Sequence, residues 1–347
     1  MSDIKKTTLD QIAAAAGVSL STVDRVMNRR GGVSPAREAK VLEWANKLNV
    51  DRVLFRGYLP MLRVAVLMQS PKNPFYRGLR NAFADIGATL SDMRLNCFIH
   101  YLDLTKPQGT IKQIHQIASV NDAMIVVCPN DPDVAEALRQ ISTKTPVVTL
   151  VTDIPTSGRI AYVGPDNRQM GRAAGELMGR FCGSQGGDVL VVLGMQHMIG
   201  HEEREMGFRS VLRERFPQFA ISETLESGED QTRAGEVVRR ALQNNPNIRG
   251  IYNVSAGNTN ITQAIRSLGL EQQMVLITHE LTTERRRMLR EGVIDVIIDQ
   301  NPHEEARRAL EIIAVHFNRL ESDKSPGSYT PFNIYIRENC PPESEFS

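Results

Sequence analysis

Short apolar runs recur along the chain from residue 63 onward, and most of them are separated by segments with helical periodicity. Alternation of strands and helices predicts parallel sheets that are covered by helices on both faces. Eight or more strands spread over about 270 residues fit two doubly wound lobes better than one sheet. The expected strands are Arg63–Met68, Leu95–Tyr101, Ala123–Cys128, Val147–Val151, Asp188–Leu193, Gly250–Val254, Met274–Thr278 and Val293–Ile298.

The limits of this α/β region follow from composition and pattern. The two lobes are expected to span residues 63–322, with Ile160–Pro165 as a first connection between them and Asp299–Pro302 as a later one. Residues 323–347 are rich in Ser, Pro and Glu and are predicted to form a tail in which Tyr329–Arg337 adds an edge strand. The beginning of the sequence has no apolar signal region, and no run of about 18 apolar residues occurs, so we expect neither secretion nor membrane insertion.

The 347 residues carry a net charge of only +1, but this charge is unevenly distributed. Residues 1–63 contain 11 Lys and Arg against 6 Asp and Glu, or +5, and the remainder contains 30 against 34, or −4. A small basic head on a mildly acidic body indicates that the head alone binds a polyanion. The cysteines Cys97, Cys128, Cys182 and Cys340 form no CxxC pair. Free thiols in a reducing cytoplasm are therefore expected rather than disulfides or a zinc site.

The basic head, residues 1–50, has the pattern of three short helices, and residues 51–62 are expected to form a hinge or linker. Gly17 ends the first helical pattern, Ser19 is a favourable N-cap for the second, and Ser34-Pro35 begins the third. A helix, a tight turn containing Gly and a capped second helix together form the helix-turn-helix signature. This small all-α domain precedes the α/β region.

The second helix of the head carries the residues that are expected to read DNA. Leu20, Ser21 and Arg25 project from its exposed face, where a major groove would meet them, and Arg25 can bond the O6/N7 edge of a guanine. An ordinary three-helix bundle with solvated charges is the alternative, but spacing, caps and charge excess together favour DNA binding. The predicted DNA-binding residues are Thr8, Ser19, Leu20, Ser21, Thr22, Arg25, Asn28 and Leu54.

The segment Thr8–Asn28 followed by Val33-Ser34 resembles the N-terminal domain of the LacI/GalR family of bacterial transcription regulators. The two-lobed body resembles the effector domain of that family, which has the fold of type I periplasmic binding proteins. The resemblance implies a homodimer or a tetramer in the cytoplasm that binds a palindromic double-stranded operator. It also implies that Leu20, Ser21 and Arg25 occupy the base-reading positions.

The hinge departs from the family pattern. The family usually carries Pro-Asn-x-x-Ala-x-x-Leu after the third helix, and the leucine of this hinge helix wedges into the minor groove. Residues 49–60 read Asn-Val-Asp-Arg-Val-Leu-Phe-Arg-Gly-Tyr-Leu-Pro here, without that proline or alanine. Leu54 and Leu59 are alternative wedges. A linker that places Arg52 and Arg56 on phosphates is the other interpretation.

Two facing lobes place the loops from the carboxyl ends of their strands around one cleft, where a ligand is expected to bind. The loop after the first strand, Gln69–Tyr76, supplies an amide and two aromatic rings that suit a sugar, although Phe75 can also serve as a core residue. Each polar residue after another strand is singly a cap or loop group, but together they fit a polyol, whose buried hydroxyls donate and accept hydrogen bonds. The predicted ligand-binding residues are Asn73, Phe75, Tyr76, Asp131, Asp153, Arg204, Asn258, His279, Glu280 and Gln300.

The body also resembles the periplasmic sugar-binding proteins of the ribose-binding type. Asn73–Tyr76 is similar to their aromatic loop, and Arg204 to their ligand-clamping arginine. Asn258 and Gln300 fall at their cleft asparagine and at the glutamine of their last connecting segment. These relatives commonly have an apolar or aromatic residue followed by Asp where this chain has His279-Glu280. The effector can therefore be a sugar, another polyol, a sugar acid or a sugar phosphate.

Other classes of protein lack their motifs in this sequence. No GxGxxG follows a strand and no Walker A motif occurs, so no nucleotide cofactor is expected. His197 and His201 have no third metal ligand placed near them, and no catalytic triad can be defended, so we expect neither a metal nor an enzyme. The run Glu284–Arg287 is interpreted as a solvated helix face. The sequence predicts a sugar-responsive repressor or corepressed regulator, and a solute-binding protein without a role on DNA is the alternative.

Overall fold

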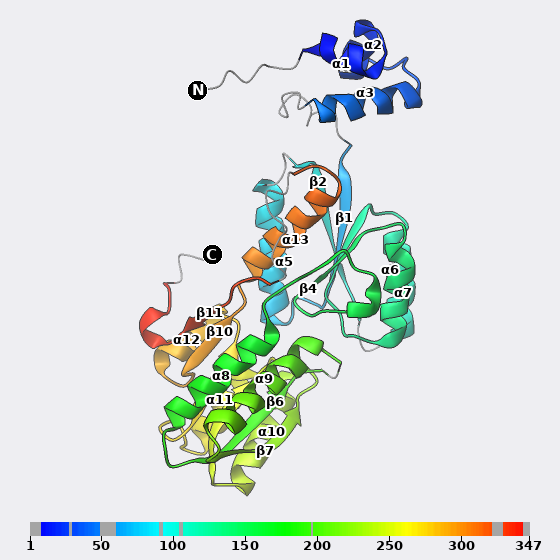
Figure 1. Cartoon of the computed structure of the whole chain (residues 1–347). Coiled ribbons are helices and arrows are strands. Elements are labelled where there is room, and N and C mark those ends of the chain that lie inside the picture. Colours follow the sequence, from blue (N-terminus) through cyan, green and yellow to red (C-terminus); the bar gives the residue numbers. More distant parts are fainter. Residues whose placement is uncertain are drawn as a thin grey trace, which may run out of the picture.

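The computed structural model describes residues 8–27, 30–48, 60–89, 93–103, 107–195, 197–320 and 329–342. A small helical head is followed by two α/β lobes (Figure 1). The predicted fold class, an all-α head and two parallel-sheet lobes, is confirmed. Asn28, Leu54 and Leu59 were predicted to contact DNA or to wedge into it, and they lie outside the described residues.

The head contains three helices, α1 (Leu9–Ala16), α2 (Leu20–Met27) and α3 (Pro35–Lys47). Gly17 ends α1 in the left-handed conformation, with φ 63°, which a residue with a side chain adopts only at a cost. This turn brings α2 across α1, and one apolar core forms between the three helices. Its buried residues are Ile12, Ala13, Ala16, Val23, Val26, Met27, Val41 and Ala45.

The first lobe contains a five-stranded parallel sheet in the order β2-β1-β3-β4-β5. Its strands are β1 (Leu62–Met68), β2 (Leu95–Tyr101), β3 (Ala123–Val126), β4 (Val147–Leu150) and β5 (Ala161–Val163). The helices that cover this sheet are α5 (Pro74–Thr89) and α13 (Pro302–His316) on one face, and α6 (Pro107–Ala118) and α7 (Pro132–Ser142) on the other. The near-continuous burial of β1, β3 and β4 is typical of strands that are covered on both faces.

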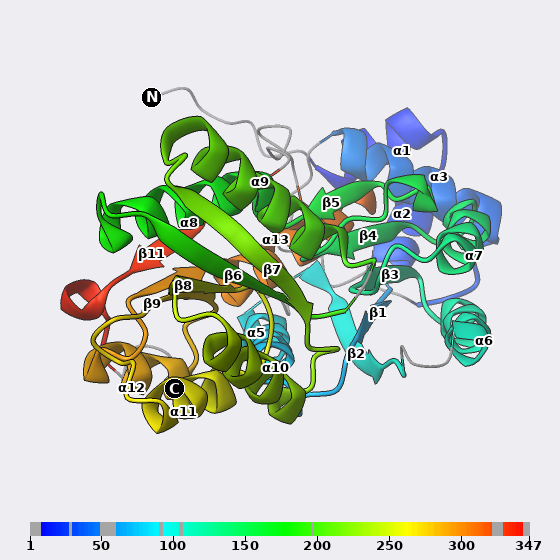
Figure 2. The ribbon, with the colours of Figure 1, turned by 90° about the horizontal axis from the view of Figure 1, so that it is seen from below.

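The second lobe contains a six-stranded sheet in the order β11-β10-β9-β8-β6-β7, in which only β11 is antiparallel. Its strands are β6 (Gly187–Leu193), β7 (Phe219–Glu226), β8 (Ile248–Asn253), β9 (Val275–His279), β10 (Val296–Asp299) and β11 (Asn333–Tyr335). The helices α8 (Asn167–Cys182) and α9 (Ile199–Arg215) pack on one face, and α10 (Gln231–Asn244), α11 (Asn258–Ser267) and α12 (Thr283–Glu291) on the other (Figure 2). Both lobes thus repeat the doubly wound order in which the first strand lies beside the third.

The chain passes between the lobes more than once. It leaves the first lobe after β5 and returns from β10 into α13, which packs on the sheet of the first lobe. After α13, β11 pairs with β10 of the second lobe, and the N–H of Thr330 donates to the carbonyl of Gly164 at 2.8 Å. The structure differs from the sequence prediction in two strands. Part of the expected first connection is strand β5, and the edge strand β7 was missed because most of its residues are polar or exposed.

None of the helices within the described residues is both long enough and apolar enough to cross a membrane.

Candidate functional site

The head presents an exposed face along α2. Leu20 is 46% exposed, and Ser21 and Arg25, one helical turn apart, are exposed beside it. The hydroxyl of Ser19 accepts a hydrogen bond from the N–H of Thr22 at 3.2 Å, so Ser19 caps α2 as predicted from its position. An exposed leucine at the start of α2 and an exposed arginine in its last turn lie above a packed core, and we expect this surface to meet a major groove.

Two further residues that were predicted to bind DNA make hydrogen bonds within the head. Thr8 is exposed at the N-cap of α1, where its N–H donates to Oε1 of Gln11 at 3.0 Å. Thr22 is half-buried, and its hydroxyl lies 2.8 Å from the hydroxyl of Ser19. Their contacts with DNA stay predictions.

The cleft between the lobes is lined from both sides by loops that follow strands. It encloses about 40 Å³, which is room for about three water molecules at roughly 10–15 Å³ each. Because a sugar needs more space than this, the lobes or their side chains must move when a ligand enters. Of the ten predicted ligand-binding residues, those that line the cleft are Asn73, Phe75, Tyr76, Arg204, Glu280 and Gln300.

Arg204 of α9 is buried at the centre of the cleft, with 3% of its surface exposed. Its Nε donates to Oδ1 of Asn167 at 2.7 Å, and its Nη2 donates to Oε1 of Gln300 at 3.0 Å. The helices α8 and α9 approach so closely that a Cβ at Gly171 would lie 1.9 Å from the carbonyl oxygen of Arg204. Arg204 is therefore held by two neutral amides, of which Asn167 lies on the closely packed helix α8, and its charge is left for a ligand.

Glu280 directly follows β9, and its carboxyl group is hydrogen-bonded to the side chain of Gln300. Gln300 Nε2 donates to Oε1 of Glu280 at 2.7 Å, whereas Oε2 of Glu280 is buried without a partner among the described residues. Burial, with a smaller contribution from Asp299, raises the pKa of Glu280 to about 8. Glu280 thus holds a proton at neutral pH and offers the cleft an unused hydrogen-bonding oxygen.

Arg285 of α12 lines the cleft and was missed, because the run Glu284–Arg287 was interpreted as solvated. That interpretation is wrong for Arg285 and Arg286, which are 5% and 3% exposed. Arg285 Nη1 donates to the carbonyl of His279 at 2.6 Å. The amide of Asn258, with its oxygen turned toward Arg285, accepts from Nε at 2.8 Å. Asn258, at the start of α11, therefore positions Arg285 and does not itself line the cleft.

His279 does not reach the cleft, although it was predicted to bind the ligand. It is the last residue of β9, and it is not among the residues that line the cleft. Its Nε2 lies 2.8 Å from the hydroxyl of Tyr252, and the ring is 1% exposed. The imidazole in the cleft is that of His201 instead, and burial, followed by the charge of Arg204, lowers its pKa to about 3. His201 is therefore neutral at physiological pH.

Asp131 and Asp153 also lie outside the cleft lining. Asp131 is the N-cap of α7 and accepts from the N–H groups of Asp133 and Val134 at 2.9 and 3.1 Å. Asp153 is held by Arg159, whose Nη2 donates to Oδ2 at 2.6 Å. Carboxylates after a strand were predicted to face the ligand, but here they stabilise the local turns.

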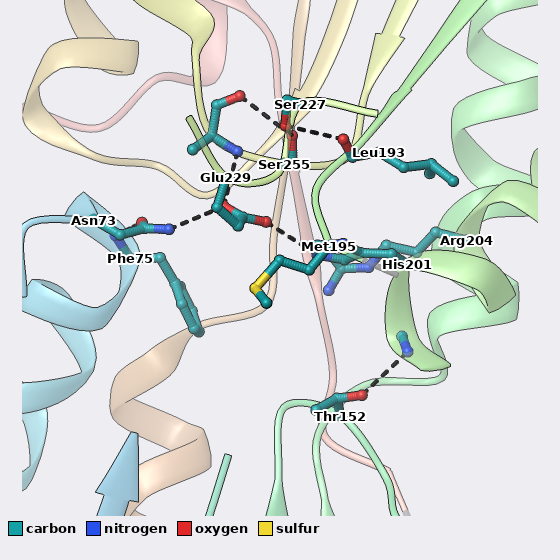
Figure 3. Close-up of polar contacts among 12 residues, drawn as sticks. Asn73, Phe75, Thr152, Leu193, Met195, His201, Arg204, Ser227, Glu229 and Ser255 are labelled. Carbon is teal, nitrogen blue, oxygen red and sulfur yellow. Dashed lines mark hydrogen bonds and ion pairs between the residues drawn. The ribbon is translucent and has the colours of Figure 1, made fainter. Parts of the chain in front are cut away.

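Polar contacts join the two lobes across the cleft (Figure 3). The N–H of Gly200 in the second lobe donates to Oγ1 of Thr152 in the first at 3.2 Å. The N–H of Asn130 donates to the carbonyl of His197 at 2.8 Å. The structure therefore has its lobes closed on each other.

Glu229 makes a further contact between the lobes and was not predicted. Nδ2 of Asn73, in the first lobe, donates to Oε2 of Glu229 at 3.2 Å. Glu229 follows the missed strand β7, and recognition of that strand would have placed it at the carboxyl end of the sheet with the other cleft residues. Among the described residues, no three His, Cys, Asp or Glu side chains are placed to hold a metal ion.

A helix-turn-helix head on a two-lobed clamp defines a DNA-binding regulator with an effector cleft. Residues 8–50 match the lacI family of bacterial regulatory proteins, and residues 64–319 match the periplasmic binding protein domain. The body of the chain therefore belongs to the periplasmic binding protein domain family, and its head has the helix-turn-helix domain of the lacI family of regulators.

Known relatives agree with this assignment. The chain is 28% identical over 248 residues to the HTH-type transcriptional regulator DegA of Bacillus subtilis (strain 168), covering 68% of this chain and 70% of the relative. It is 26% identical over 253 residues to the ribose operon repressor of Halalkalibacterium halodurans, covering 71% of each. A glucose-galactose binding protein from Geobacillus stearothermophilus has the same fold, with a TM-score of 0.73, 20% identity, and coverage of 82% of this chain and 100% of that chain.

Proposed function

We propose that this regulator binds a palindromic operator as a homodimer through α2, and that a neutral sugar or polyol in the cleft sets its operator affinity. The observation that carries the proposal is the combination, in one chain, of the exposed face formed by Leu20, Ser21 and Arg25 with a buried polar cleft. We also infer a cytoplasmic location for the chain, because an operator on bacterial DNA is reached there.

The chemistry of the cleft supports a neutral, polyhydroxylated effector. Arg204 and Arg285 supply charged donors, Glu280 supplies a protonated carboxyl with a free oxygen, and Asn73 supplies an amide. Such a mixture of donors and acceptors matches hydroxyl groups, each of which both donates and accepts. The aromatic rings of Phe75 and Tyr76, 5.2 Å apart in an edge-to-face arrangement, give the cleft an apolar wall. The ribose operon repressor and the glucose-galactose binding protein are named for sugars, which are polyhydroxylated ligands of the same class.

The proposed mechanism is linkage between the cleft and the head. An effector that prefers one arrangement of the lobes shifts the population toward it, and by reciprocity DNA shifts effector affinity. The two heads of a dimer must span half-sites about 34 Å apart, so a small rotation between the subunits changes operator affinity. Relief of repression and corepression both use this head and this cleft. Whether an effector lowers or raises operator affinity is measured by adding sugars in the assay below. The cleft is proposed to bind its effector without transforming it.

The test is selection of operator sequences from a random duplex library by the purified chain, followed by fluorescence anisotropy at fixed ionic strength. Arg25→Ala is expected to lose about 1–3 kcal/mol of discrimination between the selected duplex and a scrambled one. Arg37→Ala, an exposed arginine on α3, is the matched control and should at most weaken both duplexes equally. A chain that selects no sequence, with or without sugars, would refute the proposed function.

A solute-binding protein without a role on DNA is the second candidate, and the likeness of the body to the glucose-galactose binding protein favours it. The same selection separates the two functions, because a solute-binding protein would bind sugars but would not discriminate between duplexes.

A further inference from the structure

Glu229 lies between the lobes and lines the cleft (Figure 3). Its Oε2 accepts from Nδ2 of Asn73 in the first lobe at 3.2 Å and from the N–H of Ala256 in the second at 3.4 Å. Its Oε1 lies 4.0 Å from Nε2 of His201. One carboxylate thus contacts both walls of the cleft.

The backbone of the second lobe is shaped to direct this side chain inward. Glu229 has φ 61° and follows Gly228 with φ 66°, so two consecutive residues adopt the left-handed conformation. Glycine adopts this conformation freely, but it costs a glutamate free energy. Gly194 leaves the space that the carboxylate fills, because a Cβ there would lie 1.8 Å from Oε1 of Glu229. Burial raises the pKa of Glu229, so the inward position also has an electrostatic cost.

We propose that Glu229 acts as an internal ligand, which holds the effector-free lobes closed and which an effector must displace. An effector binds only those molecules in which Glu229 is not inserted into the cleft. The apparent affinity for every effector is therefore the intrinsic affinity multiplied by the fraction of those molecules. An effector that binds well has to supply its own acceptor to Asn73. Glu229 then determines which polyols are selected, through the hydrogen bond that they must replace. This consequence rests on the proposed function, but the contacts of Glu229 with both lobes do not.

Hydrogen exchange of two backbone amides reports the closure without any effector. The N–H groups of Gly200 and Asn130 donate across the cleft, to Thr152 and His197, and become exposed when the lobes part. The experiment is hydrogen–deuterium exchange with mass spectrometry on the effector-free full chain. It compares the peptides that contain these two residues with peptides from β1 and β6.

Glu229→Ala removes the carboxylate, and Gly194→Ala keeps it but takes its space. Both variants are expected to raise exchange at Gly200 and Asn130 about tenfold and to leave β1 and β6 unchanged. Glu223→Ala, an exposed glutamate on β7, is the matched control and should match the unaltered chain.

Unchanged exchange at the two amides in both variants would overturn the proposal. Acceleration that extends equally to β1 and β6 would mean a general loss of stability and would overturn it as well. A chain that binds no operator would refute the proposed function and leave this exchange result intact.

Discussion

Glu280 allows a sharp test of the electrostatics of the cleft. Its side chain is buried, and its Oε2 has no partner among the described residues. Its pKa is raised from 4.5 to about 8, chiefly by burial. The folded protein therefore keeps this carboxyl protonated at pH 7, whereas the unfolded chain ionises it. Ionisation of the unfolded chain favours unfolding, so Glu280 lowers the stability of the protein at neutral pH.

The size of this effect depends on pH in a defined way. Below pH 4.5 both states are protonated and the penalty vanishes; it grows as the pH rises to about 8, where the folded state also ionises. At about 1.4 kcal/mol per pKa unit, the full shift corresponds to at most about 5 kcal/mol, of which about 3 kcal/mol is present at pH 7. Glu280→Gln keeps the shape, preserves the acceptor for Gln300 and removes the ionisable group.

We expect Glu280→Gln to raise the unfolding free energy by about 3 kcal/mol or more at pH 8, and by less than about 1 kcal/mol at pH 5. The measurement is urea denaturation of the effector-free chain, followed by circular dichroism at both pH values. Glu223→Gln is the control, because this glutamate is exposed on β7. Equal stabilisation at pH 5 and pH 8 would show that packing rather than charge is responsible, and would refute the reasoning.

Two further substitutions test the framework around Arg204. Arg204→Ala is expected to abolish the thermal stabilisation by an effector sugar and to leave effector-free operator affinity within about twofold, because the head is remote; a parallel loss of operator binding would contradict separate sites. Gly171→Ala places a Cβ 1.9 Å from the carbonyl oxygen of Arg204 and should destabilise the chain by about 1–3 kcal/mol in urea denaturation. Its control, Gly78→Ala in α5, meets only Pro302 at 3.9 Å and should be neutral or stabilising; equal effects of the two would exclude the close packing of α8 and α9 as the cause.

The periodicity of the sequence was sufficient to predict the fold because buried parallel strands are continuously apolar. Strands β1, β3 and β4 are of this kind and were found at nearly their observed positions. Strand β7 was not found, because it lies at the edge of the sheet and most of its residues are exposed. Its apolar residues are interrupted by Ser, Thr and Glu, so no continuous apolar run marks it. Strand β5 has only three residues and is shorter than the pattern that periodicity can detect.

The cleft was predictable only in outline. The rule that ligands bind at the carboxyl ends of parallel strands led to Asn73, Arg204 and Gln300, which the structure places in the lining of the cleft. The rule does not say which of two adjacent polar residues turns inward, since a polar residue in the loop after a strand can instead be the N-cap of the next helix, as Asp131 is. Arg285 was missed for a different reason: its charge suggested solvent, but backbone carbonyls stabilise it in a buried position.

The position of Arg204 explains how an effector could act on the whole chain. Its partners Asn167 and Gln300 lie where the chain crosses between the lobes, Asn167 at the start of α8 and Gln300 between β10 and α13. Asn167 also donates to the hydroxyl of Tyr162 in β5 at 3.2 Å. A ligand that draws Arg204 toward itself therefore pulls on both connections at once. Because these connections join the two lobes, we expect a ligand contact at this guanidinium to rotate one lobe against the other.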